Sequence, residues 1–313
     1  MINFRFHVVS IIAVFLAIAI GTVLGSAFVG RGVVDRLQNQ IDRVQKNADE
    51  ANSENERLKS DAGATARYID QTAAYAVGRS LPGVTVAVVS ERGLEGGVLD
   101  AQATLARDAG AAVPGVVWLE ERWSLSRAED LTALRAATGL TTRAPAALRT
   151  QAAALLGQRL AAGAPATGDD VLTNLANADF VTLSGVAGSP APTAADFVAG
   201  ARGLVLGGPQ SPLPDGVEPA LAGGMLDGAA KVVVGEAFVA TEEVTDRATW
   251  IDSIADADAL RNRLSTVDDV EGTAGQVASV LALAELGAGG HGNYGLGRDP
   301  TVPAKVVTVP STK

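Results

Sequence analysis

The run VTVAVVS, residues 84–90, decides the fold of this chain. It is apolar almost throughout and rich in β-branched residues, which favour strands. A strand with one solvent-exposed face alternates apolar and polar residues, whereas a continuous apolar run is typical of a strand buried on both faces. Residues 84–90 are therefore predicted to form an inner strand of a parallel sheet.

Runs of the same kind recur along the chain, and helical stretches separate them. They are GVVWLEE (115–121), DFVTLSG (179–185), GLVLGG (203–208), KVVVGEAF (231–238) and LSTVDDV (264–270). Helix boundaries are marked by capping boxes, an N-terminal proline and C-terminal glycines. These signals are the boxes 126–129, 249–252 and 273–276, together with Pro145, Gly139 and Gly163. Alternating strands and helices predict an α/β fold, with a mostly parallel sheet and helices on both faces.

A heptad repeat precedes the first strand. Its principal a and d positions are Val34, Leu37, Ile41, Val44, Asn55 and Leu58. β-Branched residues at a with Leu at d favour two parallel helices, and a single Asn at a fixes their register. The repeat predicts a parallel coiled-coil stalk and a homodimer. The alternative is a solvated single helix, because Ala48 and Ala51 form small layers and Gly63 costs about 1 kcal/mol within a helix.

The segment HVVSIIAVFLAIAIGTVLGSAFVG, residues 7–30, leads into this repeat. A helix over residues 8–29 carries no charge and is long enough to cross a hydrocarbon core of about 30 Å. A cleaved signal peptide is the alternative, since Arg5 supplies a basic flank and residues 25–27 are small. Small residues recur every four positions, at Ala13, Ala17, Gly21 and Gly25. Such a face pairs membrane helices and favours a retained anchor.

The chain therefore divides into four predicted segments. They are a membrane anchor with its N-terminal flank (1–30), a coiled-coil stalk (31–75), an α/β domain (76–287) and an irregular tail (288–313). The basic residues that follow the anchor nominally favour a cytoplasmic stalk. Long domains cross membranes regardless of such charges, so charge alone does not fix the orientation.

Composition excludes several functions. The net charge of −10 argues against nucleic acid as a partner, because phosphate backbones attract clustered Lys and Arg. The absence of cysteine removes disulfides, thiolate metal sites and cysteine nucleophiles. Aromatic residues make up only 4% of the chain, so Ala, Val and Leu must build the core.

Few residues in the chain form a pattern typical of a catalytic, cofactor-binding or metal-binding site. The glycine pattern at residues 290–295 formally matches a dinucleotide fingerprint, but it follows a helix instead of a strand and is interpreted as a turn. Asp268 and Asp269 end a strand just before a helix, where carboxylates can hold a hard cation or complement the helix N-terminus. His291 is a further weak metal candidate. No catalytic set is found and no cofactor is predicted, so the chain is expected not to be an enzyme. An enzyme or small-ligand receptor that uses the crevice near Asp268 and Asp269 is the alternative.

Three stretches make the chain resemble the actinobacterial copper transport protein MctB family. They are MINFRFHVVSIIAVFLAIAIGTVLGSA (1–27), STVDDVEGTAGQVASVLALAEL (265–286) and GNYGLG (292–297). The resemblance spans nearly the whole chain. It implies a cell-envelope protein that limits copper accumulation and is described as an outer-membrane channel, with relatives linked to cell-wall assembly and division. It also implies a single-pass protein whose C-terminal domain is extracytoplasmic.

The residues themselves disagree with part of that implication. Copper(I) prefers thiolates and thioethers, but the chain has no Cys and only Met1 and Met225. A β-barrel pore needs many alternating strands, and the strands expected here are short and continuously apolar. Copper is thus implied by the resemblance only. Besides the enzyme or receptor alternative, two functions remain open: copper efflux or homeostasis, and a non-enzymatic dimeric scaffold that recruits envelope assembly or division partners through its α/β domain.

Overall fold

A computed structural model describes residues 4–94, 96–209, 211–238, 249–255, 260 and 263–295, without the side chains of residues 26–34, 249, 253 and 255. Contacts divide the chain into two units, Met1–Ala66 and Arg67–Lys313. The first unit contains most of α1 (Phe4–Val77), a helix of 74 residues. The last turns of α1 belong to the second unit, where Ala73 and Val77 are buried in the core.

The second unit is an α/β domain built on a single sheet. Its strands are β1 (Val86–Glu91), β2 (Val116–Leu119), β3 (Val181–Ser184), β4 (Arg202–Gly207), β5 (Val232–Glu236), β6 (Ser265–Val267) and β7 (Asn293–Tyr294). Their order is β3-β2-β1-β4-β5-β6-β7, and only β3 runs antiparallel to its neighbour among these strands. The predicted mostly parallel sheet is confirmed. The segment expected to be an irregular tail contributes β7, which pairs with β6.

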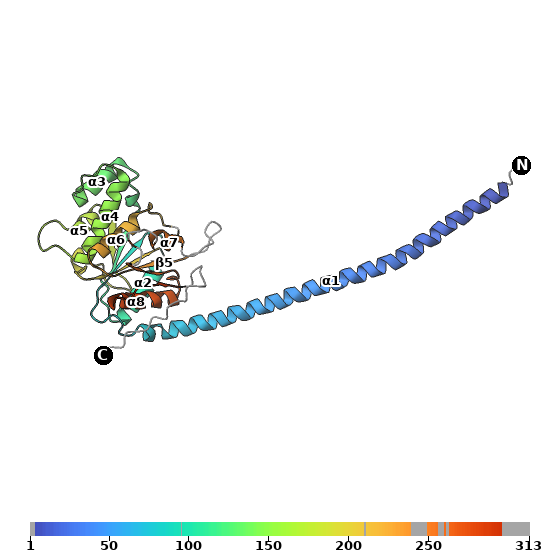
Figure 1. The fold of residues 1–313 in the computed structure, drawn as a ribbon, viewed down its shortest axis with the longest axis horizontal. Coiled ribbons are helices and arrows are strands. Elements are labelled where there is room, and N and C mark those ends of the chain that lie inside the picture. The colour runs from blue at the N-terminus through green and yellow to red at the C-terminus, as the bar shows by residue number, and fades with distance from the viewer. Residues whose placement is uncertain are drawn as a thin grey trace. The chain divides into compact units, whose positions relative to one another are not determined.

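Helices cover both faces of this sheet, as predicted. They are α2 (Gly96–Asp108), η1 (Glu121–Ser124), α3 (Ala128–Thr138), α4 (Pro145–Ala162), α5 (Val171–Asn177), η2 (Ala194–Asp196), α6 (Val217–Asp227), α7 (Thr249–Ala255) and α8 (Thr273–Gly287). Figure 1 shows α2 and α8 on one face and α3 to α7 on the other.

Residues of β1 alternate between the two cores. Ala87 and Val89 pack with α3 to α7, whereas Val86 and Val88 pack with α2, α8 and the end of α1. All six residues of β1 are buried. The continuous apolar run of this strand is therefore explained by burial on both faces.

Several helix ends follow the predicted signals. Pro145 is the first residue of α4, and Gly139 and Gly163 end α3 and α4 with positive φ angles of 72° and 78°. A proline is tolerated in the first turn and a glycine adopts positive φ without strain, which explains both placements.

Two of the predicted capping boxes are shifted or replaced. At α3 the N-cap is Arg127, whose backbone N–H donates to the carboxylate of Asp130 at 3.1 Å, so the motif starts one residue later than expected. At α8 the hydroxyl of Thr273 donates to Asp70 of α1. The side chain of Gln276 donates to the carbonyl of Val270 at 3.1 Å, so it serves the preceding loop. The third box, at residues 249–252, involves a side chain outside the described residues.

Helices α4 and α6 pack unusually closely because small residues face each other. A Cβ added at Gly157 would overlap the carbonyl oxygen of Leu221, and one added at Gly224 would overlap that of Ala154. Cores tolerate added volume poorly, because the surrounding backbone must move. These two glycines therefore set the distance between the two helices.

Replacing Gly224 with Ala is expected to lower the free energy of unfolding by about 1–3 kcal/mol through overpacking. The neighbouring change Gly223→Ala is the matched control, since its new methyl would lie in ordinary contact 3.5 Å from Leu260. Ala has the higher helix propensity, so this control is expected to be neutral or to stabilise by up to about 1 kcal/mol. Urea denaturation of both variants checks the difference. Equal stabilities would contradict the close-packing argument.

Candidate functional site

Buried acidic residues gather at the carboxyl edge of the parallel sheet. Glu91 ends β1, Glu236 ends β5, and Asp268 and Asp269 follow β6 directly; all four are buried. The strand order reverses between β1 and β4, because β2 lies on one side of β1 and β4 on the other. In open α/β sheets, ligands bind outside the carboxyl ends of strands at this switch point. This edge is therefore the candidate functional site.

Glu91 lies at the switch point, where it bonds to the residue after β4 and interacts with Glu218 of α6. Its Oε1 accepts a hydrogen bond of 3.0 Å from the backbone N–H of Gly208, which follows β4. Glu218, in the first turn of α6, accepts a hydrogen bond of 3.0 Å from the hydroxyl of Ser211. Both carboxyl groups are buried, and within the described residues Oε2 of Glu91 has no hydrogen-bond partner.

This environment favours the neutral forms of both acids. Burial raises the pKa of Glu91 to about 8; the nearby hydroxyl of Ser211 and the hydrogen bond from Gly208 oppose the rise, and the negative charge of Glu218 adds to it. Burial likewise raises the pKa of Glu218, against hydrogen bonds that lower it. Two adjacent buried carboxyl groups cannot both ionise without a large cost, so the pair retains a proton at neutral pH.

Glu236 has a structural explanation. Its Oε2 accepts hydrogen bonds of 3.1 Å from the backbone N–H groups of Trp250 and Ile251, at the start of α7. Its backbone carbonyl accepts a further bond of 3.1 Å from Val270. The carboxylate therefore accepts hydrogen bonds from backbone N–H groups in the first turn of α7, which have no partner within the helix, and so holds α7 against the sheet.

The structure places the predicted metal candidates at opposite edges of the sheet. Asp268 and Asp269 lie at the carboxyl end of β6, where Asp268 packs tightly against Gly295. His291 precedes β7, and because β6 and β7 are parallel it lies at the amino edge. The three residues do not converge. In the described part of the chain, no three His, Cys, Asp or Glu residues form a group that could hold a metal ion.

Sequence reasoning missed the central residues of this site. Glu91 and Glu236 carried a usable signal, since each is an acid at the end of an otherwise apolar strand. Glu218 carried no such signal, because it lies in an ordinary helical first turn and reaches Glu91 only through the fold.

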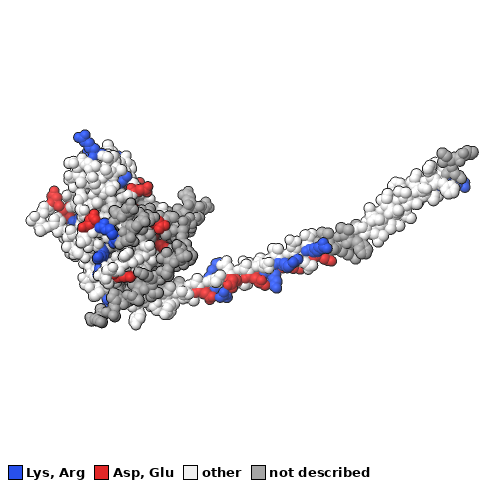
Figure 2. Space-filling model, in the orientation of Figure 1, with Lys and Arg blue, Asp and Glu red and all other residues white. Residues whose placement is uncertain are grey.

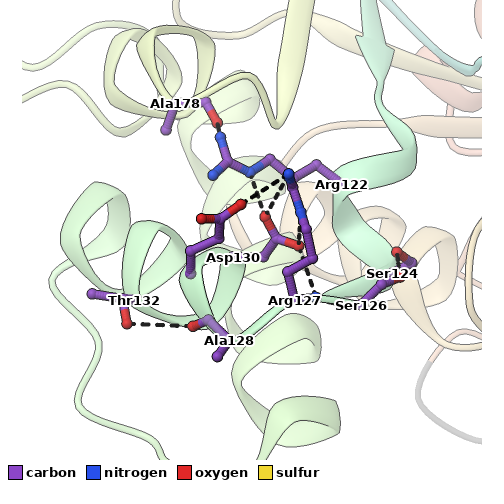
Figure 3. Close-up of polar contacts among 9 residues, drawn as sticks. Arg122, Ser124, Ser126, Arg127, Ala128, Asp130, Thr132 and Ala178 are labelled. Carbon is purple, nitrogen blue, oxygen red and sulfur yellow. Dashed lines mark hydrogen bonds and ion pairs between the residues drawn. The ribbon is translucent and has the colours of Figure 1, made fainter.

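A second polar cluster lies between η1 and α3 (Figure 3). Arg122 donates to Asp130 at 2.8 Å and to the carbonyl of Ala178 at 2.7 Å. Arg127 pairs with the same carboxylate at 3.1 Å. Burial would raise the pKa of Asp130, but the hydrogen bonds from Arg127 and Arg122 lower it below its usual value. The charged groups of this network pair with one another and with a backbone carbonyl, so the network stabilises the local fold.

The first unit consists of an apolar segment followed by a charged one. One helix segment in the described residues, Phe4–Gly25, is long and apolar enough to cross a membrane, with a mean hydropathy of 2.7. Ala13, Ala17, Gly21 and Gly25 are exposed on it, and a Cβ added at either glycine would meet nothing within 4 Å. Figure 2 shows charged side chains gathering farther along α1.

Apolar side chains also remain exposed in the charged segment. The exposed fractions of Leu37, Ile41, Val44 and Leu58 are 53%, 59%, 62% and 54%. Asn55 is exposed as well, and the side chain of Val34 lies outside the described residues. The same segment also contains ion pairs within the helix, such as Glu54–Arg57 at 2.6 Å.

Together these features define a class of protein: a doubly wound α/β domain that follows an N-terminal apolar helix of membrane-spanning length. A family model described as "Copper transport outer membrane protein, MctB" matches residues 1–304. The chain belongs to this family, and the resemblance seen in the sequence is confirmed.

Curated relatives cover nearly the whole chain. Proteins named copper transporter MctB from Mycobacterium tuberculosis (strain H37Rv) and Mycobacterium bovis are each 29% identical over 317 residues, which is 95% of this chain and 97% of the relative. The protein of the same name from Mycobacterium leprae is 28% identical over 328 residues, covering 99% of this chain and all of the relative.

Glu91→Gln tests the buried acid pair through the pH dependence of stability. The folded pKa is about 8 and the usual value is 4.5, so the folded state binds the extra proton between these values. Stability is therefore full below about pH 4.5 and declines as the pH rises toward 8. The neutral amide is expected to reduce this decline in urea denaturation. Glu121→Gln, at an exposed carboxylate of η1, is the control and should leave the decline unchanged; a wild-type stability that is flat across this range would refute the assignment.

Proposed function

We propose that the chain is a membrane-anchored, dimeric envelope protein that supports copper homeostasis through partners of its α/β domain, without being an enzyme. The observation that carries the proposal is the exposed apolar stripe Leu37, Ile41, Val44 and Leu58 on α1. Water contact with such side chains is costly, and burying one fully contributes about 1.5–3 kcal/mol. A second copy of α1, aligned in parallel, presents the same stripe at the same height.

The register of that dimer follows from the heptad. Ile41 and Asn55 occupy a positions, and Leu37, Val44 and Leu58 occupy d positions. Paired asparagines at position 55 hydrogen-bond to each other only when the two helices are in register, which fixes a parallel dimer. The open faces of Gly21 and Gly25 support close pairing of the same two helices within the bilayer.

An indirect role in copper handling is favoured by the chemistry of the available ligands. The chain has no Cys, two Met and two His. Met225 is fully buried in the core, and its side chain packs next to Gly203. Soft donors that copper(I) requires are thus scarce, which supports action through partners. Direct copper efflux, which the family description suggests, is the second candidate function.

Two pairs of aspartate substitutions test the dimer. Ile41→Asp with Val44→Asp places charges in the apolar stripe, and is expected to convert a dimer into a monomer in mild detergent. Asn39→Asp with Ser53→Asp adds the same charges on the opposite face of the heptad and should remain dimeric. Light scattering after size exclusion measures the mass, and copper content of cells complemented with each variant measures the function.

Each outcome of that comparison is informative. Loss of both dimer and copper phenotype in the stripe variant alone supports the proposal. A wild-type chain that is monomeric in mild detergent overturns it. Purified wild-type protein that gives stepwise ionic currents in lipid bilayers would instead favour direct transport.

The location of the α/β domain is tested by introducing a single cysteine. The natural chain contains none, so Thr132→Cys, at an exposed position of α3, provides the only thiol. We propose that the domain lies outside the cytoplasm, and therefore expect a membrane-impermeant maleimide to label it in intact cells. The wild-type chain is the background control. Labelling that appears only after lysis would place the domain in the cytoplasm.

A further inference from the structure

The last turns of α1 carry two exposed tyrosines. These turns belong to the second unit, and the exposed fractions of Tyr68 and Tyr75 are 68% and 92%. Among the described residues of that unit, Val198 is the one other large hydrophobic side chain that is exposed, at 46%. Tyrosine offers a large apolar area and loses little conformational entropy on burial, so it is enriched in contact surfaces. The face of α1 that carries both rings is therefore a candidate interaction surface.

A different side of the same helix docks on the α/β domain. Ala73 and Val77 are buried in the core with residues of α2 and α8. Nearby, Asp70 accepts a hydrogen bond from Thr273 at the start of α8. The a and d positions of the heptad that begins at Val34 form the seam at which two helices meet. Counted in this heptad, Ala73 is an e position and Val77 a b position, so both lie on one side of the seam.

The tyrosines lie on the other side of the seam. Tyr68 and Tyr75 are both g positions, seven residues apart, so their side chains lie on the same face of the helix. The a and d positions between the two sides are Ala62, Thr65, Ile69, Thr72 and Ala76. Small and polar layers bury little apolar area, so the seam alone contributes little to a dimer at this end of α1.

The geometry of a parallel helix pair brings the two sides together. In such a pair, the g side of each helix faces the e side of the other helix. The e side of each α1 is the side that docks on its own α/β domain, through Ala73 and Val77. The g-side tyrosines of one copy therefore face the place where α1 of the other copy meets its α/β domain.

We propose that Tyr68 and Tyr75 of each copy pack against the α/β domain of the second copy. This inference rests on the dimer proposed above and adds a contact to it at the domain end of α1. A tyrosine buries about 150–250 Å², so two rings add about 300–500 Å² per partner, a large part of the roughly 800 Å² per partner typical of stable interfaces. The second copy is therefore an occupant that both covers the rings and completes the dimer interface.

Site-specific photocrosslinking tests the contact directly. The photoreactive aromatic residue p-benzoylphenylalanine replaces Tyr68 or Tyr75 in the full chain in dodecyl maltoside, a neutral detergent. Irradiation is expected to give a covalent dimer in which the crosslink lies in the α/β domain of the other copy. Arg67 is the matched control site, because it is exposed at an f position on the outer face of the helix. The same residue in place of Arg67 should give no covalent dimer.

Alanine substitutions measure what the rings contribute to dimerisation. Tyr68→Ala with Tyr75→Ala is expected to weaken dimerisation at least ~10-fold, as for the loss of buried aromatic side chains at an interface. Both rings are exposed in the single chain and Ala has the higher helix propensity, so the thermal stability of the α/β domain should not fall. Arg67→Ala is the control and should leave dimerisation unchanged. Sedimentation equilibrium in dodecyl maltoside measures the dissociation constants.

The outcomes separate this contact from the stalk dimer itself. Crosslinks to the α/β domain of the other copy, together with weaker dimerisation of the tyrosine variant alone, support the proposal. A wild-type chain that is dimeric but crosslinks from positions 68 and 75 only to α1 of the other copy, or not at all, overturns this contact and leaves the stalk dimer intact. Covalent dimers that form equally well from position 67 also overturn it. A monomeric wild-type chain overturns both proposals.

Discussion

Burial of the central parallel strands on both faces is the constraint on which the rest of the domain depends. Because β1, β4 and β5 are covered by helices on both sides, their interior positions must be apolar, and polar side chains are confined to the strand ends. Parallel strands share one carboxyl edge and one amino edge. The same constraint therefore collects acids such as Glu91 and Glu236 at the carboxyl edge.

The sequence predicted this architecture because the signal is local. The run at 84–90 specifies a strand buried on both sides, and alternation with capped helices specifies the α/β class. Strand order is not local, so neither the switch point between β1 and β4 nor the added strand β7 was predicted. Capping motifs failed where tertiary contacts competed, as when Thr273 bonded to Asp70 and Gln276 to Val270. The pairing of Glu91 with Glu218 was missed for the same reason, since only folding brings β1 and α6 together.

The scarcity of aromatic side chains is compensated by close backbone approach. With 4% aromatic residues, the core relies on Ala, Val and Leu, and dispersion forces reward short distances between them. Gly157 and Gly224 let α4 and α6 approach until backbone atoms touch. Arg159 then fastens the end of α4: it binds Asp170 at 2.5 Å and the carbonyls of Ala194 and Phe197. Burial would raise the pKa of Asp170, but hydrogen bonds, first that from Arg159, lower it.

The outermost strands of the sheet are short. β7 has two residues, and β3 has four and runs antiparallel to β2. Unpaired backbone groups along an outer strand are templates on which other chains can polymerise, and short outer strands provide few of them. The membrane anchoring proposed above would confine these molecules to a lipid surface, where they meet at far higher local concentration than in free solution. A sheet with short outer strands resists amyloid-like stacking under such crowding. Contacts between neighbouring molecules then depend on side chains and not on the backbone.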